Sequence, residues 1–154
     1  MSRKIQIGVI GGRRVSPSVL LFAEQVGEAI ATRDAVLICG GLGGVMEAAC
    51  RGAKKAGGTT IGILPVASPD KANSHIDISI ATDMGVARNA IIIHSCDGVV
   101  AVGGKYGTLS EMAFALQKGI PVVSLKSWIP DPSVQSAETA EEAVELLFRK
   151  IDKL

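Results

Sequence analysis

Short apolar runs alternate with amphipathic helical patterns along nearly the whole chain, and this alternation constrains the fold more than any other feature. The runs that we expect to form strands cover residues 4–12, 35–41, 59–65, 76–81, 97–104 and 120–125. Strands separated by helices imply right-handed crossovers and a mainly parallel sheet that is covered on both faces. The sequence therefore predicts a three-layer, Rossmann-like α/β fold.

Helical periodicity is expected over residues 16–33, 44–58 and 82–96, from Thr108 onward, and over 139–154. Ser16 is the expected N-cap of the first helix, and Thr139 with Glu142 forms a capping box at the start of the last. The stretch 128–136 is expected to be a loop. No repeat or linker indicates a boundary, so residues 1–154 are expected to form a single domain.

The composition narrows the function as well as the fold. Hydrophobic residues make up 47% of the chain but aromatic residues only 3%, so the core must consist of small aliphatic side chains. The net charge is +1 and no segment is strongly basic, which does not favour nucleic-acid binding. No apolar run approaches the roughly 18 residues of a membrane span. We therefore expect a cytoplasmic protein that contacts neither nucleic acid nor membrane.

The residues that most often bind metals show no ligand pattern. Cys39, Cys50 and Cys96 contain no CxxC spacing and are expected to be reduced core residues. His75 and His94 share no ligand spacing with each other or with a cysteine. The sequence therefore predicts no metal site and no required cofactor.

Glycines gather where the predicted strands end. Because the carboxyl ends of parallel strands meet at one edge of a sheet, these turns should converge there. Glycine lets backbone N–H groups approach a ligand, and each turn opens onto a helix N-terminus, where an anion such as phosphate is favoured. The expected ligand-binding residues are Gly11, Gly12, Gly41, Gly43, Gly44, Gly103, Gly104, Gly107 and Thr108.

The same glycines could serve the backbone alone, because each cluster could simply form a tight turn between a strand and a helix. Two familiar nucleotide-binding motifs do not fit them. Residues 41–46 and 8–13 both miss the GxGxxG pattern, and no acid ends the second strand, which argues against a dinucleotide-binding Rossmann enzyme. The absence of GxxxxGK[ST] excludes a P-loop NTPase.

Glu111 and Arg88 are candidate catalytic residues at the same edge. Glu111 stands three residues after Thr108, so it could merely complete a helix capping box. At the mouth of a phosphate site, however, its carboxylate could stabilise a developing oxocarbenium charge or activate water. Arg88 lies early in a predicted helix, where a cation opposes the dipole, so it is either a solvated surface residue or a partner for an anion.

Three segments together resemble the LOG-type (LONELY GUY-like) superfamily, whose members are often mislabelled lysine decarboxylases and which includes molybdenum-cofactor carriers. They are CGGLGGVMEAACRGAKKAGGTTIGILP, MGVARNAII and VGGKYGTLSE, and the likeness extends over roughly residues 5–125. The resemblance implies that Gly103, Gly104, Gly107 and Thr108 bind phosphate and that Gly41, Gly43 and Gly44 form a first glycine-rich loop. It likewise implies that Glu111 and Arg88 are the catalytic acid and arginine. It further implies a homodimer with the site near the subunit contact.

Three functions are open for a site that holds a small phosphorylated ligand, and the resemblance implies the first two. The main expectation is a phosphoribohydrolase that cleaves the N-glycosidic bond of nucleoside 5′-monophosphates, since Arg88 and Glu111 are retained. The alternative is a molybdenum-cofactor carrier that binds without turnover, favoured by Asn89, which replaces a lysine of the enzymes, and by Val102, which replaces a proline. The third is a nucleotide sensor.

Overall fold

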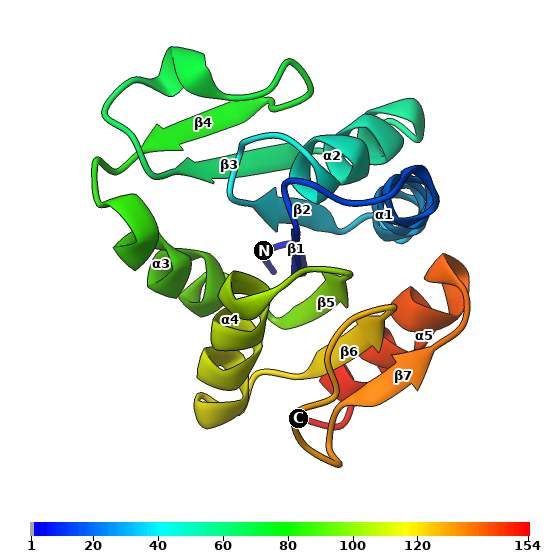
Figure 1. Ribbon diagram of the computed structural model, residues 1–154. Coiled ribbons are helices and arrows are strands. Elements are labelled where there is room, and N and C mark those ends of the chain that lie inside the picture. Colours follow the sequence, from blue (N-terminus) through cyan, green and yellow to red (C-terminus); the bar gives the residue numbers. More distant parts are fainter. Residues whose placement is uncertain (1) are drawn as a thin grey trace.

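The computed structural model describes residues 2–154 and contains seven strands in one parallel sheet of order β4-β3-β2-β1-β5-β6-β7 (Figure 1). The strands are β1 Gln6–Gly11, β2 Val36–Cys39, β3 Thr60–Leu64, β4 Ile78–Ala81, β5 Gly98–Val102, β6 Val122–Leu125 and β7 Gln135–Ala137. The helices are α1 Pro17–Thr32, α2 Val45–Lys55, α3 Asn89–His94, α4 Tyr106–Gln117 and α5 Ala140–Ile151, with short 3-10 turns η1 Pro69–Lys71 and η2 Gly85–Arg88. The predicted α/β fold with a parallel sheet is confirmed.

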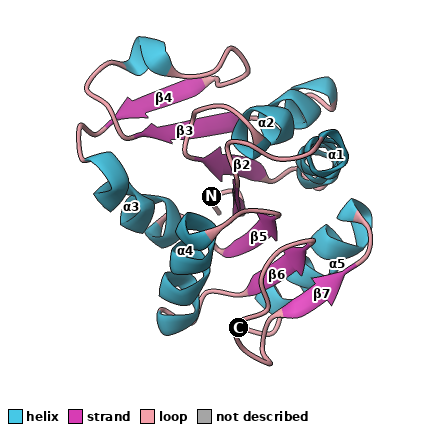
Figure 2. Ribbon diagram, viewed as in Figure 1, coloured by secondary structure: helices cyan, strands magenta, loops and turns pink. Residues whose placement is uncertain are grey.

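The helices lie in two layers on opposite faces of the sheet, with α1, α2 and α5 on one side and α3 and α4 on the other (Figure 2). Alternate residues of the central strands point to the two layers, as the pleat of a strand requires. In β1, for example, Val9 packs beneath the first layer and Ile10 beneath the second. The core contains no buried tryptophan or tyrosine among the described residues, as the composition led us to expect.

Helix capping follows the sequence closely at α1 and α5. The Ser16 hydroxyl accepts a hydrogen bond from the Val19 amide at 3.4 Å, and Pro17 is the first helical residue. The Thr139 hydroxyl accepts from the Glu142 amide at 3.1 Å, while the Glu142 carboxylate accepts from the Glu138 amide. Both predicted N-termini are therefore confirmed.

Three local expectations were wrong. The helix expected over 82–96 begins as a 3-10 turn at Gly85, because Asp83 and Gly85 have φ of 52° and 57°, which helical backbone does not allow. The helix expected from Thr108 begins at Tyr106, with Lys105 as its N-cap. The stretch 128–136, expected to be a loop, includes the start of β7, which has only three residues and only one buried side chain.

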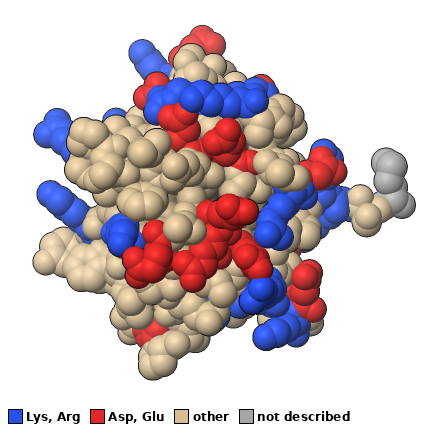
Figure 3. Space-filling view, turned by 90° about the vertical axis from the view of Figure 1, so that its right-hand side faces the viewer, with Lys and Arg blue, Asp and Glu red and all other residues tan. Residues whose placement is uncertain are grey.

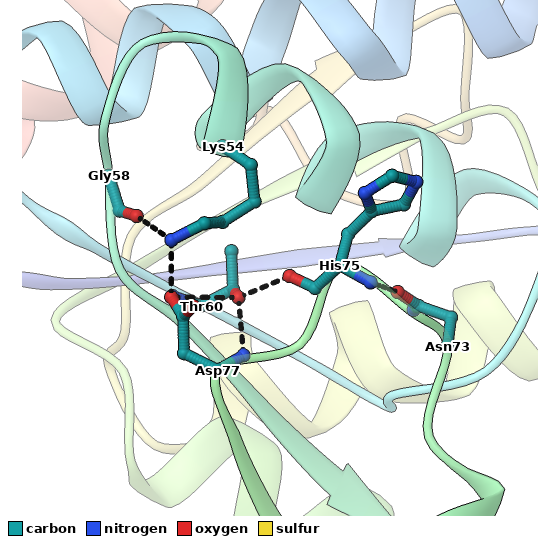
Figure 4. A network of polar contacts seen from close by, with 6 residues as sticks. All are labelled: Lys54, Gly58, Thr60, Asn73, His75 and Asp77. Carbon is teal, nitrogen blue, oxygen red and sulfur yellow. Dashed lines mark hydrogen bonds and ion pairs between the residues drawn. The ribbon is translucent and has the colours of Figure 1, made fainter.

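A polar network fastens the edge strand β4 to the rest of the sheet (Figure 4). The Asp77 carboxylate accepts hydrogen bonds from the Thr60 amide at 2.9 Å and from Lys54 Nζ at 2.8 Å. The Thr60 hydroxyl donates to the His75 carbonyl at 2.6 Å, and the His75 amide donates to the Asn73 side chain at 3.0 Å. This network fixes residues 73–77, which precede β4, against the start of β3. Asn73 at the other end of this segment contacts the turn that follows β2.

Charge is mixed on the side of the molecule formed by α1, α2 and α5. Figure 3 shows a group of acidic side chains near the middle of this face, with Lys and Arg distributed around it rather than in one continuous basic surface. No helix within residues 2–154 combines the length and the apolar character needed to cross a membrane. Nor do His, Cys, Asp and Glu gather there in groups of three or more that could hold a metal ion.

Candidate functional site

A cavity of about 480 Å³ lies at the carboxyl edge of β1 and β5, bounded by the loops that follow these strands and by η2 and α4. The sequence-predicted residues that line it are Gly11, Gly12, Arg88, Gly104, Gly107, Thr108 and Glu111. A Cβ atom at Gly12 would come within 3.5 Å of the Gly104 Cα, so the two loops are in close contact. Residues far apart in the sequence therefore meet around one space, as the parallel topology requires.

The turn from β5 to α4, residues 103–108, presents unpaired amides to this cavity. The first bond of α4 runs from the Leu109 amide to the Lys105 carbonyl at 3.0 Å. The amides of residues 104–108 donate to no acceptor within residues 2–154. Because these donors lie at the positive end of the helix dipole, the turn is suited to bind an anion.

Tight packing fixes the shape of this β5–α4 turn. Gly104 has a φ of 96°, and a Cβ atom there would lie 2.1 Å from the Thr108 hydroxyl. The Gly103 amide donates to the Leu125 carbonyl at 3.1 Å, and the Gly103 carbonyl accepts from Ser127. Gly103 therefore anchors the turn and is not among the residues that line the cavity.

An aromatic pair supports the same turn from outside. The indole nitrogen of Trp128 donates to the Lys105 carbonyl at 3.0 Å, and its ring stacks on Tyr106 with 5.9 Å between the ring centres. Within the chain, Trp128 therefore packs against the N-terminus of α4.

The turn from β2 to α2, residues 40–44, is also glycine-rich but does not line the cavity. The Gly41 amide donates to the Cys39 sulfur at 3.3 Å, and the Gly41 carbonyl accepts from the Asn73 amide at 2.9 Å. A Cβ atom at Gly44 would lie 2.5 Å from the Arg13 backbone, whereas one at Gly43 would meet nothing closer than 3.8 Å. Gly41, Gly43 and Gly44 are therefore not among the residues that line the cavity; Gly41 is buried, and Gly43 and Gly44 are partly exposed.

Gly40, in the same β2–α2 turn, makes room for Arg88. A Cβ atom at Gly40 would lie 2.7 Å from Arg88 Nη2 and 2.7 Å from the Met46 sulfur. Arg88 is only 9% exposed, and its Nε donates to the Ile63 carbonyl at 2.9 Å. Its other two hydrogen bonds run to the Gly40 carbonyl and to the Asn89 side chain. Arg88 is therefore a held, buried cation rather than a solvated surface residue.

Glu111 faces the cavity from the second turn of α4. No hydrogen bond of its carboxylate is found within residues 2–154, and Thr108 is the third residue of the helix, whose N-cap is Lys105. The capping-box interpretation of Glu111 is therefore wrong. Burial raises the pKa of Glu111 to about 7, and the charge of Arg88 opposes that rise. Burial lowers the pKa of Arg88, and Glu111 opposes that change in turn.

The cavity also contains residues that we did not predict to bind a ligand. Arg13, Arg14 and Lys105 line it together with Val15, Met46 and Asn89. Both arginines follow directly on the Gly11-Gly12 pair, and Lys105 lies inside the predicted phosphate turn. The sequence signal that could have identified Arg13, Arg14 and Lys105 as cavity residues is their position next to glycines that were predicted to bind a ligand.

A larger hollow, of about 780 Å³, lies between α1 and α5. It is lined by residues such as Glu28, Arg33 and Glu141, and the N-terminus of α5 that borders it carries the acids Glu141 and Glu142 in its first turn. Its chemistry does not favour a phosphorylated ligand, so we place the candidate site at the strand edge.

A parallel sheet covered by helices on both faces, with an amide-rich turn, a buried arginine and a carboxylate at one edge, defines the class of this protein as Rossmann-like α/β. The chain belongs to the SLOG cluster4 family, whose family model matches residues 4–151. With the similarities that follow, this confirms the resemblance to the LOG-like superfamily that includes molybdenum-cofactor carriers.

Three known proteins are similar to this chain. The molybdenum cofactor binding protein of Rippkaea orientalis is 40% identical with a TM-score of 0.92, over 98% of this chain and 99% of that one. The molybdenum cofactor carrier protein of Chlamydomonas reinhardtii is 34% identical with a TM-score of 0.89, over 97% and 99%. The cytokinin riboside 5′-monophosphate phosphoribohydrolase of Mycobacterium tuberculosis is 32% identical over 71% of this chain and 64% of that protein.

Proposed function

We propose that this protein binds the molybdenum cofactor or a related phosphorylated pterin as a carrier. The observation that carries the proposal is the set of unpaired amides at residues 104–108 beside the buried Arg88, in one cavity. The full-length similarity to two molybdenum-cofactor proteins supports the carrier over the hydrolase that the sequence led us to expect first.

In this proposal the phosphate of the ligand lies at the N-terminus of α4. The amides of the β5–α4 turn donate to its oxygens, and the helix dipole stabilises its charge. A guanidinium carries five N–H donors, and Arg88 uses three of them within the chain. Two N–H donors of Arg88 therefore remain for the ligand in this cavity.

Glu111 supplies a proton-dependent contact in the same cavity. With its pKa raised to about 7, the carboxyl exists in both protonation states near neutral pH. The protonated form can donate a hydrogen bond to an anionic or carbonyl group, and the ionised form can accept one from a ring N–H. Either contact would orient a pterin ring next to the bound phosphate.

A direct test is to purify the protein from cells grown with molybdate, oxidise it, and measure the fluorescence of the released pterin. We expect pterin at close to one equivalent per chain, and Gly104→Ala should abolish it. Gly119→Ala is the matched control, because Gly119 also has a positive φ, of 72°, but no neighbouring atom within 4 Å of the added Cβ. Protein without pterin, from cells that make the cofactor, would contradict the carrier.

The second candidate function is a phosphoribohydrolase acting on nucleoside 5′-monophosphates. Arg88 and Glu111 share one cavity and influence each other electrostatically, which favours acid–base chemistry at this place. Arg88 would orient the ribose phosphate, and Glu111 would assist the attack of water as the base departs. Incubation with AMP, CMP and GMP, followed by chromatography, tests this function: base released by the native protein but not by Glu111→Gln would support it.

We also propose a homodimer formed through the α3–α4 side of the sheet. Within residues 2–154, α3 and α4 are the two helices that cover this face, and Ile78 and Ile80 of the edge strand, paired in register with Ile61 and Ile63, remain about half exposed. Val86, in the η2 turn that leads into α3, is 80% exposed. A second copy would cover this surface, next to an apolar cavity of about 270 Å³ that shares Asn89 and Glu111 with the ligand cavity.

The dimer can be tested by light scattering after gel filtration. Val86→Asp and Ile80→Asp should each give a monomer, because a charge would be buried unpaired in the contact. Leu21→Asp is the control, since Leu21 is exposed on α1, in the opposite layer. A native protein that is monomeric at high concentration would contradict the dimer.

A further inference from the structure

Arg13 and Arg14 line the ligand cavity beside the β5–α4 turn, and a single phosphate at that turn leaves them without a role. They stand in the short loop between β1 and α1. Two contacts fix the backbone of this loop. The Val45 amide donates to the Gly12 carbonyl at 3.0 Å, and the backbone of Arg13 packs directly against Gly44.

Neither arginine has a partner within residues 2–154. The other arginines of the chain do: Arg3, Arg51 and Arg149 form ion pairs with acids, Arg33 lies over the Phe148 ring, and Arg88 donates to carbonyl oxygens. Both side chains are exposed, where an unpaired arginine is ordinary, but these two are adjacent and line a cavity that already contains the buried Arg88.

The position of these charges is unfavourable without a ligand. Arg13 and Arg14 stand just before the N-terminus of α1, where the helix dipole repels cations. Arg13 also acts electrostatically on Arg88, adding to the lowering of the pKa of Arg88 by burial. Lys105 brings a further positive charge to the cavity wall, and Glu111 is the one acid among the lining residues. The cavity therefore has more positive charge than one phosphate balances.

We propose that Arg13 and Arg14 form a second anion subsite, so that the ligand carries another anionic group besides the phosphate held by the β5–α4 turn. Guanidinium groups bind oxoanions with paired, charge-assisted hydrogen bonds, and two of them on adjacent residues of one cavity wall suit a group with several oxygens. An oxoanionic metal centre at the far end of a phosphorylated pterin has this chemistry. A nucleoside monophosphate does not, since it offers one anionic group.

This inference rests on the proposed function, because it extends the same cavity, but it can fail separately. Tungstate is a suitable probe, since it is an oxoanion with the charge of a phosphate group and is visible by anomalous scattering. The stoichiometry and affinity of tungstate are measured by calorimetry, and its positions by crystallography. We expect two tungstate ions per chain, one at residues 104–108 and one between Arg13 and Arg14.

Variants assign the two subsites. The double variant Arg13→Gln/Arg14→Gln should weaken one tungstate at least about tenfold and leave the other unchanged. Gly104→Ala should weaken the tungstate at residues 104–108 and leave the tungstate at Arg13 and Arg14 unchanged. Arg33→Gln is the matched control, because it removes an arginine that lies over Phe148, away from the cavity, and it should change neither affinity.

The outcomes separate the two claims. A single tungstate at residues 104–108, insensitive to the double arginine variant, would overturn the second subsite and leave the proposed phosphate site standing. A single tungstate at the arginines alone would overturn the phosphate turn. Tungstate held only by residues outside the cavity, an adventitious ion only, would contradict both.

Discussion

Two glycine-rich turns lie at the same edge of the sheet, but one lines the cavity and the other packs against the rest of the protein. The β5–α4 turn opens its amides to the cavity, whereas the β2–α2 turn packs against Arg88, Arg13 and the segment around Asn73. In the first, glycine allows a ligand to approach the backbone; in the second, it allows the protein itself to approach. A glycine cluster in the sequence thus indicates that something approaches the backbone closely, but it does not distinguish a ligand from another part of the protein.

The largest expected effect is at the open turn. Gly104→Ala would place a methyl group 2.1 Å from the Thr108 hydroxyl and displace the amides around it. Losing two charge-assisted hydrogen bonds costs about 3 kcal/mol or more, so the affinity for a phosphorylated ligand should fall about 100-fold. Titration calorimetry measures the loss, and an unchanged affinity would show that the phosphate binds elsewhere.

Gly40→Ala tests whether the packed turn acts through Arg88. The added methyl group would meet Arg88 Nη2 at 2.7 Å and displace the guanidinium. We expect about tenfold weaker binding, equivalent to one hydrogen bond to a charged group. Gly43→Ala, with no atom nearer than 3.8 Å, should bind normally. Equal losses in both variants would mean that the β2–α2 turn itself contacts the ligand.

Asn73→Ala should affect stability rather than binding. The Asn73 side chain donates to the Leu42 carbonyl at 2.9 Å and accepts from the His75 amide at 3.0 Å. Losing both bonds should lower the free energy of unfolding by about 1–2 kcal/mol, measured in urea. Ligand affinity should change less than about twofold; a larger loss would mean that the packed turn must be held in place for binding.

The last prediction concerns Glu111 and the pH dependence of stability. Because burial raises the pKa of Glu111 from 4.5 to about 7, the folded protein holds this proton more tightly than the unfolded chain. The stability due to the proton is therefore complete below about pH 4.5 and is lost as the pH rises through about 7. The melting temperature of Glu111→Gln, relative to the native protein, should rise across this window and then level off. A difference that is flat with pH would contradict the raised pKa.

The sequence predicted the architecture well because apolar periodicity and capping residues are local signals. It placed Ser16 and Thr139 correctly as helix caps, but it missed β7, where three residues with one buried side chain give no periodic pattern. At the site it placed Gly104, Arg88 and Glu111 on one edge. It could not distinguish an open turn from a packed one, since that depends on contacts such as those of Asn73 and Arg88, distant in sequence.

The central claim is that phosphate binds the amides of the β5–α4 turn and not those of the β2–α2 turn. At 154 residues the chain is suited to two-dimensional ¹H–¹⁵N NMR, so inorganic phosphate can be titrated while each amide is observed. We expect the largest, saturable shifts at residues 104–108 and only small ones at Gly41 and Gly43. Shifts centred on Gly41 and Gly43, with the amides of 104–108 unmoved, would contradict this claim.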